Sequence, residues 1–118
     1  MSEFEWGWAI GMFEGEGTIH LQKPNSNVGH TLPHGQWILQ VQMTDEDVVR
    51  RFHTIVGVGH VTGPYQPQRR TPGHPYKVVW QWKCGRNEDT LALLYIMLPA
   101  LGDRRQVKAL ECLTDMVV

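Results

Sequence analysis

The sequence predicts an α+β fold in which antiparallel strands are covered by helices on one face. Helical segments open the chain, separate two pairs of strand segments and close the chain, in the order α-β-β-α-β-β-α-α. The strand segments alternate polar and apolar residues, and a stretch rich in turn-forming residues joins the members of each pair. Antiparallel hairpins with helices packed on one face form α+β domains, and 118 residues suit a single domain over 1–118.

The first helix is expected to run from Ser2 to about Glu14. Ser2 and Glu5 have the spacing of a capping box, which starts a helix by satisfying its free backbone N–H groups. Gly15 and Gly17 permit backbone angles that end a helix, so we expect the chain to continue there as a loop.

This helix carries glycines on one face and acids at its end. The glycines recur every four residues, so they line one face nearly without side chains, and a second backbone could approach it closely; they are Gly7, Gly11 and Gly15. Glu14 and Glu16 follow at the negative pole of the helix, which costs stability. We therefore expect a compensating cation at this pole.

The first strand pair is predicted at 18–23 and 36–43. In each segment polar residues alternate with aliphatic residues or tryptophan, and the loop over 25–35 is rich in Asn, Ser, Gly, Pro and His. Thr44 is expected to cap a helix over 45–56, whose first turn is acidic and so suits the positive pole.

The second strand pair is predicted at 59–63 and 76–83. The proline-rich stretch 64–75 between them cannot be regular. Helices are expected over 88–97 and 103–116, and Pro99 separates them.

The strands have two chemically different faces. One carries tryptophans and aliphatic residues, which can pack on the helices, whereas the other carries Thr, His, Gln and Lys and lacks the acids of an ordinary solvated face. Glutamine and lysine can bind base edges in the major groove, and arginines in a loop can bind phosphates or guanines. The residues expected to contact DNA are Thr18, His20, Gln22, Lys23, Gln36, Gln40, Arg69, Arg70, Lys77 and Gln81.

The charge distribution supports a polyanionic partner although the net charge is −1. The stretches 17–44 and 48–87 contain basic residues and no acid, while the acids gather in the predicted helices.

The two cysteines lie far apart in the sequence, without the spacing of a disulfide or metal-binding pair, which indicates buried small hydrophobic residues in a reducing compartment. The six histidines show no ligand spacing, which argues against a histidine metal site or a His-Asn nuclease site.

The two acids at the end of the first helix suggest hydrolytic chemistry. Hydrolysis of a DNA phosphodiester needs charge neutralised at the attacking and leaving oxygens, commonly by divalent metals on carboxylates and carbonyls. One chain with Glu16 has too few ligands. A two-fold dimer joined along the glycine face would bring two Glu16 carboxylates together. The alternative for Glu16 is a solvated acid on a glycine turn.

Residues 9–17, Ala-Ile-Gly-Met-Phe-Glu-Gly-Glu-Gly, resemble the LAGLIDADG motif of homing endonucleases, and the chain has one copy. The resemblance continues downstream, at 43–47 for a strand-to-helix turn, at 57–61 for a glycine-flanked third strand, and at 98–106 for a Pro-x-Leu…Lys-x-x-Gln helix junction. It covers nearly the whole chain and implies a saddle-shaped antiparallel sheet.

Single-motif members of that family work as homodimers, so the resemblance implies a magnesium-dependent enzyme that cuts a long, nearly palindromic DNA site with short 3′ overhangs and spreads an intron or mobile element. It implies Glu16 and the Gly15 carbonyl as metal ligands, and Lys83 and Gln42, at the ends of two strands, near the water or the scissile phosphate. Lys83 could instead be a surface lysine, and Gln42 a DNA-reading glutamine. The residues expected at the dimer interface are Gly7, Trp8, Gly11, Glu14 and Gly15, with Glu14 bracing the helix ends.

The family usually has aspartate at both acid positions, where this chain has glutamate, and this puts the metal geometry and hence the activity in question. A second hypothesis is therefore a LAGLIDADG-like protein that binds nucleic acid without cutting it, as a regulator or splicing maturase. A third is a small structural or protein-interaction domain.

The chain has no apolar run that could span a bilayer, and its start lacks the basic residues of a signal peptide. We therefore expect an intracellular protein, in the cytoplasm of a prokaryote or phage-infected cell or in an organelle, and not a secreted one.

Overall fold

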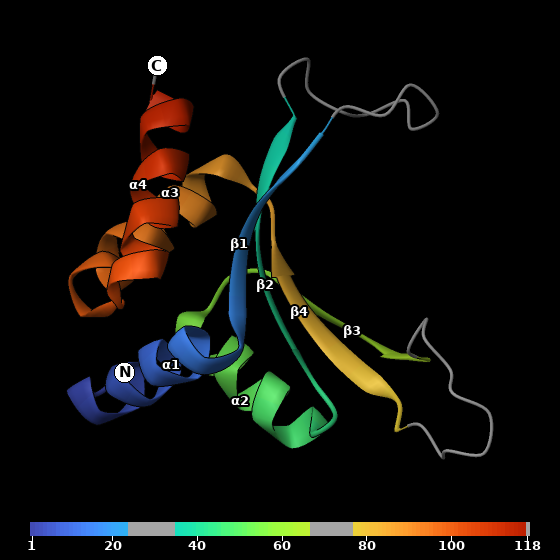
Figure 1. Ribbon diagram of the computed structural model, residues 1–118. Helices are drawn as coiled ribbons and strands as arrows, with labels where there is room; N and C mark the ends of the chain where they lie inside the picture. Colours follow the sequence, from blue (N-terminus) through green and yellow to red (C-terminus); the bar gives the residue numbers. More distant parts are fainter. Residues whose placement is uncertain (24–34, 67–76, 118) are drawn as a thin grey trace.

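The computed structural model describes residues 1–23, 35–66 and 77–117, and within these ranges the predicted α+β fold and element order are confirmed (Figure 1). The elements are α1 (Glu3–Glu16), β1 (Gly17–Gln22), β2 (Gln36–Met43), α2 (Glu46–Val56), β3 (His60–Tyr65), β4 (Val79–Cys84), α3 (Asn87–Met97), the short 3-10 helix η1 (Leu98–Ala100) and α4 (Asp103–Val117). The strands form one antiparallel sheet in the order β1-β2-β4-β3, and the helices lie on one side of it (Figure 1).

The sheet has the two chemically different faces that the alternation predicted. Its apolar face and the helices share one core, to which the strands contribute Ile19, Trp37, Leu39, Val41, Trp82 and Cys84. At the centre, the Trp82 ring meets Phe52 of α2 edge-on at 4.8 Å, and Phe52 stacks on Phe13 of α1 at 6.4 Å. The indole N–H of Trp82 donates to the Val58 carbonyl at 2.8 Å, so this buried polar group is satisfied. The core therefore fixes α1 and α2 relative to the sheet.

The end of α1 differs from the expected loop, because the helix runs to Glu16 and passes directly into β1. Gly17 is extended (φ −84°, ψ 154°), and neither it nor Gly15 has a positive φ. A side chain at Gly17 would collide with the ring and the carbonyl of Phe13. Glycine is therefore needed at 17 for close approach and not for a left-handed turn, which corrects the sequence-based explanation.

Other boundaries shift by one to three residues. Asp45, not Thr44, is the N-cap of α2, and it makes no side-chain capping bond. β3 extends beyond the predicted Gly63 to Tyr65, and β4 begins at Val79 instead of at the predicted 76. Tyr65 and Val79 are partners across the sheet. Both differences arise because a strand extends only where a neighbour supplies hydrogen-bond partners.

Both cysteines are free and buried as predicted, and burial raises the pKa of Cys84 and raises that of Cys112 to about 12. Among the described residues, every helix falls short of the length and apolar character that a bilayer span needs.

Candidate active site and nucleic-acid interface

The last turn of α1 is bound to the start of α4, 88 positions later in the chain. The Gly102 backbone N–H donates to Glu14 Oε2 at 3.1 Å, and the Arg105 guanidinium lies 3.6 Å from Glu14 Oε1. Glu14 thus lies near the positive end of α4, which offsets its unfavourable place at the negative end of α1. A compensating cation was predicted at this pole, and Arg105 fills that role for Glu14. This contact matches the bracing role expected of Glu14, while its place at a dimer interface stays a prediction.

Arg105 also holds the first residue of β1. Its Nε and Nη2 atoms donate to the Gly17 carbonyl at 3.3 and 2.8 Å. Its side chain is only 17% exposed, so these bonds are largely shielded from water. Arg105 therefore joins three elements at one point, which we call the junction: the end of α1 (Glu14–Glu16), the start of β1 (Gly17–Thr18) and the start of α4 (Gly102–Arg105).

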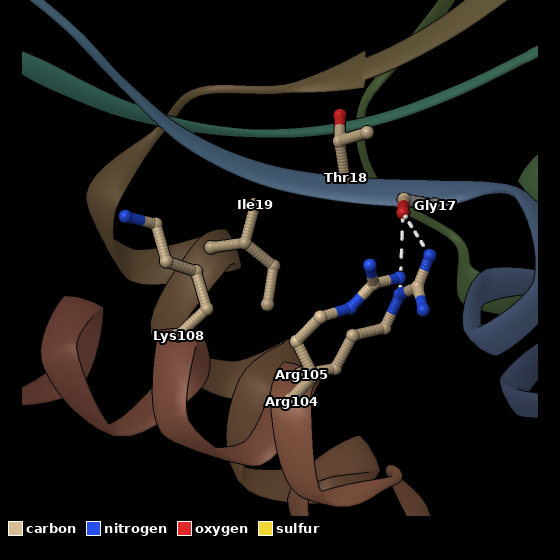
Figure 2. Close-up of a pocket in the computed structure, with 6 residues that line it drawn as sticks. All are labelled: Gly17, Thr18, Ile19, Arg104, Arg105 and Lys108. Carbon is tan, nitrogen blue, oxygen red and sulfur yellow. Dashed lines mark hydrogen bonds between the residues drawn. The ribbon is translucent and has the colours of Figure 1, made fainter.

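A cavity of about 340 Å³ opens at the junction between β1 and α4. Its lining residues are Gly17, Thr18, Ile19, Arg104, Arg105 and Lys108. The two arginine side chains extend from α4 toward Gly17 at the start of β1, whereas the Lys108 side chain lies on the other side of Ile19 and points away from them (Figure 2). Arg104 is exposed and makes no hydrogen bond or ion pair with another described residue. Lys108 pairs with Glu111 at 3.3 Å. The cavity is therefore cationic and suits an anionic ligand.

Arg104 and Arg105 fall within the stretch 98–106 that resembles the family, but no role was predicted for either. Their position in the sequence could have indicated a role. Two cations in the first turn of a helix oppose its dipole and so cost stability unless an anion lies nearby. Within the chain, Asp103 lies in the same first turn of α4, and Glu14 of α1 lies 3.6 Å from Arg105.

Glu16 ends α1 directly before Gly17, and its side chain is exposed. It makes no hydrogen bond or ion pair with the residues that the structure describes. The backbone carbonyls of a last helical turn, such as that of Gly15, lack intrahelical partners. Carboxylate and carbonyl oxygens are ligands that Mg²⁺ prefers. Within residues 1–23, 35–66 and 77–117, no group of three or more His, Cys, Asp or Glu side chains could enclose a metal. One chain thus offers a partial donor set that fits a divalent cation only with outside ligands.

The face of the sheet away from the helices, which we call the open face, carries polar residues, and two rows of them cross between the strands. One row crosses all the strands from Thr18 to Gln40, Lys83 and His60, and the next runs from Gln42 to Gln81 and Thr62. Residues directly opposite each other on one face have Cβ atoms about 5 Å apart. Lys83 thus lies two strands away from β1, whereas Gln42 lies on the strand next to it. The β1–β2 pairing places Gly17 opposite Val41, so Gln42 follows Val41 at the end of β1 that Glu16 precedes.

Several open-face residues have partners within the chain. Gln81 Nε2 donates to Gln42 Oε1 at 2.7 Å, and Gln40 Nε2 donates to the same oxygen at 3.4 Å. Gln36 uses its Nε2 for the Gly85 carbonyl at 2.8 Å, so one of its donors is already engaged. Partial burial, and then the Lys83 ammonium, lower the pKa of His20 from its ordinary value of 6.5, so His20 is neutral at pH 7.

The remaining predicted residues occupy simpler positions. Thr18, Gln22, Lys23 and Lys77 are exposed, while Arg69 and Arg70 lie outside the described residues. Trp8 is half-buried, with the Arg51 guanidinium 4.1 Å from its ring. The glycines Gly7, Gly11 and Gly15 are exposed, and a Cβ at any of them would meet nothing within 4 Å among the described residues.

Comparison with solved structures gives similarity to homing endonucleases. The chain superposes on I-CvuI in complex with its target in the presence of calcium (TM-score 0.71, 18% identity, 96% of this chain and 66% of that chain). It also superposes on I-TnaI (TM-score 0.68, 12% identity, 94% and 70%) and on the group I intron-encoded I-CeuI complexed with DNA (TM-score 0.68, 9% identity, 98% and 55%). These are LAGLIDADG proteins, so the fold that the nonamer at 9–17 predicted is confirmed. The chain spans about two thirds of the length of I-CvuI. No protein-family model and no curated protein matches the sequence.

Proposed function

We propose, from the fold that this chain shares with the LAGLIDADG homing endonucleases, that it is a metal-dependent DNA endonuclease acting as a homodimer on a long, nearly palindromic site. The observation that carries the proposal is the junction. There Glu16, whose side chain is exposed, directly precedes Gly17 in the chain, and Gly17 lines the cavity together with Arg104, Arg105 and Lys108. Phosphodiester hydrolysis needs an acid that can hold a divalent cation and positive groups that can hold a phosphate.

Glu16 would hold the cation, with the Gly15 carbonyl as a second ligand. A magnesium ion there would neutralise charge on the oxygens of the scissile phosphodiester. The remaining ligands would come from DNA phosphates and from the second subunit, because one chain supplies too few. Glutamate carries its carboxylate one methylene further from the backbone than aspartate does, so the exposed Glu16 side chain extends further from the helix end.

The two arginines have different tasks in this proposal. Arg105 is fixed by Glu14 and by the Gly17 carbonyl, and it keeps the helix end and the start of β1 in register. Arg104 is exposed beside it and would bind a phosphate oxygen of the backbone. In this proposal the phosphate contact would lie at the junction. Lys83, which the family resemblance suggested for it, would instead contact DNA from the open face, together with the other residues of its row.

The glycine face supports the homodimer. A Cβ at Gly7, Gly11 or Gly15 has free space in the described part of this chain, so packing within the subunit does not require glycine at these positions. Phe4, one turn before Gly7 on the same helix, is 77% exposed. Two such helices could approach closely along this face and bring both Glu16 side chains to the same axis. A two-fold protein of this kind matches a nearly palindromic site.

The test is cleavage of a randomised DNA library by purified protein with Mg²⁺, read by sequencing the cut ends. We expect the wild-type protein to cut within a preferred sequence, and Glu16→Gln to reduce cleavage by at least a hundredfold while DNA binding, measured by gel shift, changes less than threefold. Glu16→Asp should retain cleavage, because it keeps the carboxylate. Glu3→Gln, which removes an acid from the other end of α1, is the matched control and should cut at the wild-type rate.

Cleavage by Glu16→Gln at the wild-type rate would remove Glu16 from the mechanism. DNA binding without cleavage by the wild-type protein, under all divalent cations tried, would replace the proposed nuclease with the binding protein that the sequence left as an alternative.

A further inference from the structure

We infer that Gln42 and Gln81 act as one unit that recognises a single adenine in the major groove. The inference rests on the proposed function, because it assumes that the open face lies on DNA. It goes beyond it by naming the base and the pair of residues that would select it.

The two glutamines are bonded to each other on the open face. They lie directly opposite each other on β2 and β4, and Gln81 Nε2 donates to Gln42 Oε1 at 2.7 Å. Gln40 Nε2 donates to the same oxygen at 3.4 Å. The Gln42 oxygen is thus occupied from both sides, which leaves its two N–H donors for a ligand. Gln81 has committed one N–H and keeps a free carbonyl oxygen.

The polarity of the pair is fixed as a unit. Two amide oxygens, or two amide nitrogens, placed against each other would repel, so turning over one amide requires turning over the other. In the arrangement observed, Gln42 presents a donor and Gln81 presents an acceptor. In the inverted arrangement both roles are exchanged. Either way, the two residues present groups of opposite polarity to whatever lies on the open face.

Adenine is the base whose edge matches this pattern. In the major groove it offers an acceptor (N7) next to a donor (N6), whereas guanine offers two acceptors, cytosine a donor, and thymine an acceptor beside a methyl group. Facing guanine, one member of the pair would meet a group of its own polarity and leave it unpaired, which costs affinity. The pair therefore favours adenine over guanine at one position of each half-site.

The catalytic role that the family resemblance suggested for Gln42 leads to a different outcome. A residue that positions water changes the cleavage rate and leaves the base preference of binding unaltered. A reading residue changes the base preference even when no cleavage takes place. Binding measured without Mg²⁺ therefore separates the two roles.

The experiment is selection of a randomised duplex library by binding, without Mg²⁺, followed by sequencing of the bound DNA. The wild-type protein should prefer adenine by about fivefold to a hundredfold at one position per half-site. Gln81→Lys keeps a donor for the Gln42 oxygen but replaces the acceptor with a second donor, so the preference at that position should change to guanine. Gln81→Ala, Gln42→Ala and the double variant should each lose the preference to a similar extent, because either change breaks the unit.

Thr62→Ala is the matched control. Thr62 lies opposite Gln81 in the same row, is exposed, and makes no hydrogen bond to either glutamine. It should leave the adenine preference within twofold of wild type. Because these positions are on a solvated face, the thermal midpoints of the variants should match wild type and exclude loss of fold.

The outcomes separate this inference from the proposed function. Wild-type protein that enriches no DNA would overturn the proposed function and this inference with it. Wild-type protein that enriches a site, while Gln81→Lys leaves every base preference unchanged, would overturn this inference alone. Effects of Gln42→Ala and Gln81→Ala on two different positions that add in the double variant would also overturn it.

Discussion

Glycines on the two sides of helix α1 stand in opposite surroundings. At the junction, Gly17 has no room, and a Cβ there would collide with the ring and the carbonyl of Phe13. On the other side of the helix, Gly7, Gly11 and Gly15 have free space around the position of a Cβ. The interior of the subunit therefore requires glycine at one position, and nothing among the described residues requires it at the other three.

This difference separates constraints that act within the subunit from those that act outside it. The junction is held by buried contacts of Phe13 and Arg105, so changes there should act on folding. The glycine face makes no comparable demand, so changes there should act on association. Substitutions on the two sides test this distinction through the free energy of unfolding of the subunit.

The largest effect is expected from Gly17→Ala. The added methyl group must displace Phe13, which is fully buried and stacks on Phe52, or shift the start of β1. Overpacking of this kind costs about 3 kcal/mol. Urea unfolding followed by circular dichroism should show the loss. Gly7→Ala, on the open side of the same helix, is the matched control, and it should gain up to about 1 kcal/mol from helix propensity.

Equal stabilities for Gly17→Ala and Gly7→Ala would contradict the comparison, because the two sites would then leave the same room for a side chain. Both should be measured at concentrations where the unfolding midpoint no longer depends on protein concentration, so that association does not contribute.

A smaller loss is expected from Arg105→Met. The change keeps much of the apolar stem but removes the bonds to the Gly17 carbonyl and the charge beside Glu14. Both bonds share the Gly17 carbonyl oxygen, so together they should contribute about 2 kcal/mol, as expected of one shielded hydrogen bond to a charged group. The neighbouring Arg104 is exposed, so Arg104→Met should change the free energy of unfolding by less than about 0.5 kcal/mol.

The two arginine variants also test the division of tasks in the cavity. Arg104→Met should weaken DNA binding and cleavage at full stability, while Arg105→Met should weaken both through loss of the fold around Glu16. A stable Arg105→Met protein, or an Arg104→Met protein that unfolds more easily than it, would show that the cavity is held together differently.

The open face and the junction also differ in how far the sequence predicted them. Period-two alternation in 18–23 and 36–43 is a local pattern. It predicted which residues lie on each face of the sheet without any knowledge of which strands are neighbours. The nonamer at 9–17 likewise pointed to Glu16 through residues adjacent in the chain. Both follow from interactions within a few residues or from a repeated geometry.

The junction depends on contacts that such patterns do not contain. Arg105 reaches the Gly17 carbonyl across 88 positions, and that pairing follows from how α4 docks beside β1. The close approach that Gly17 requires depends on the Phe13 ring, whose position is set by Phe52 in another helix. The hydrogen bond between Gln42 and Gln81 depends on the β2–β4 register, which the sequence left open.

No loss of subunit stability, but a large effect on assembly, is expected from Gly11→Leu. Leucine is a better helix former than glycine and has free space here, so the free energy of unfolding of the subunit should stay constant or rise by up to about 1 kcal/mol. Its side chain would hold two glycine faces apart, so sedimentation equilibrium should show the wild-type protein as a dimer and Gly11→Leu as a monomer. Cleavage should fall with the dimer, because each Glu16 would lose the ligands of its partner. Dimers that persist in Gly11→Leu would place the interface elsewhere, and the free space around Gly11 would then need another explanation.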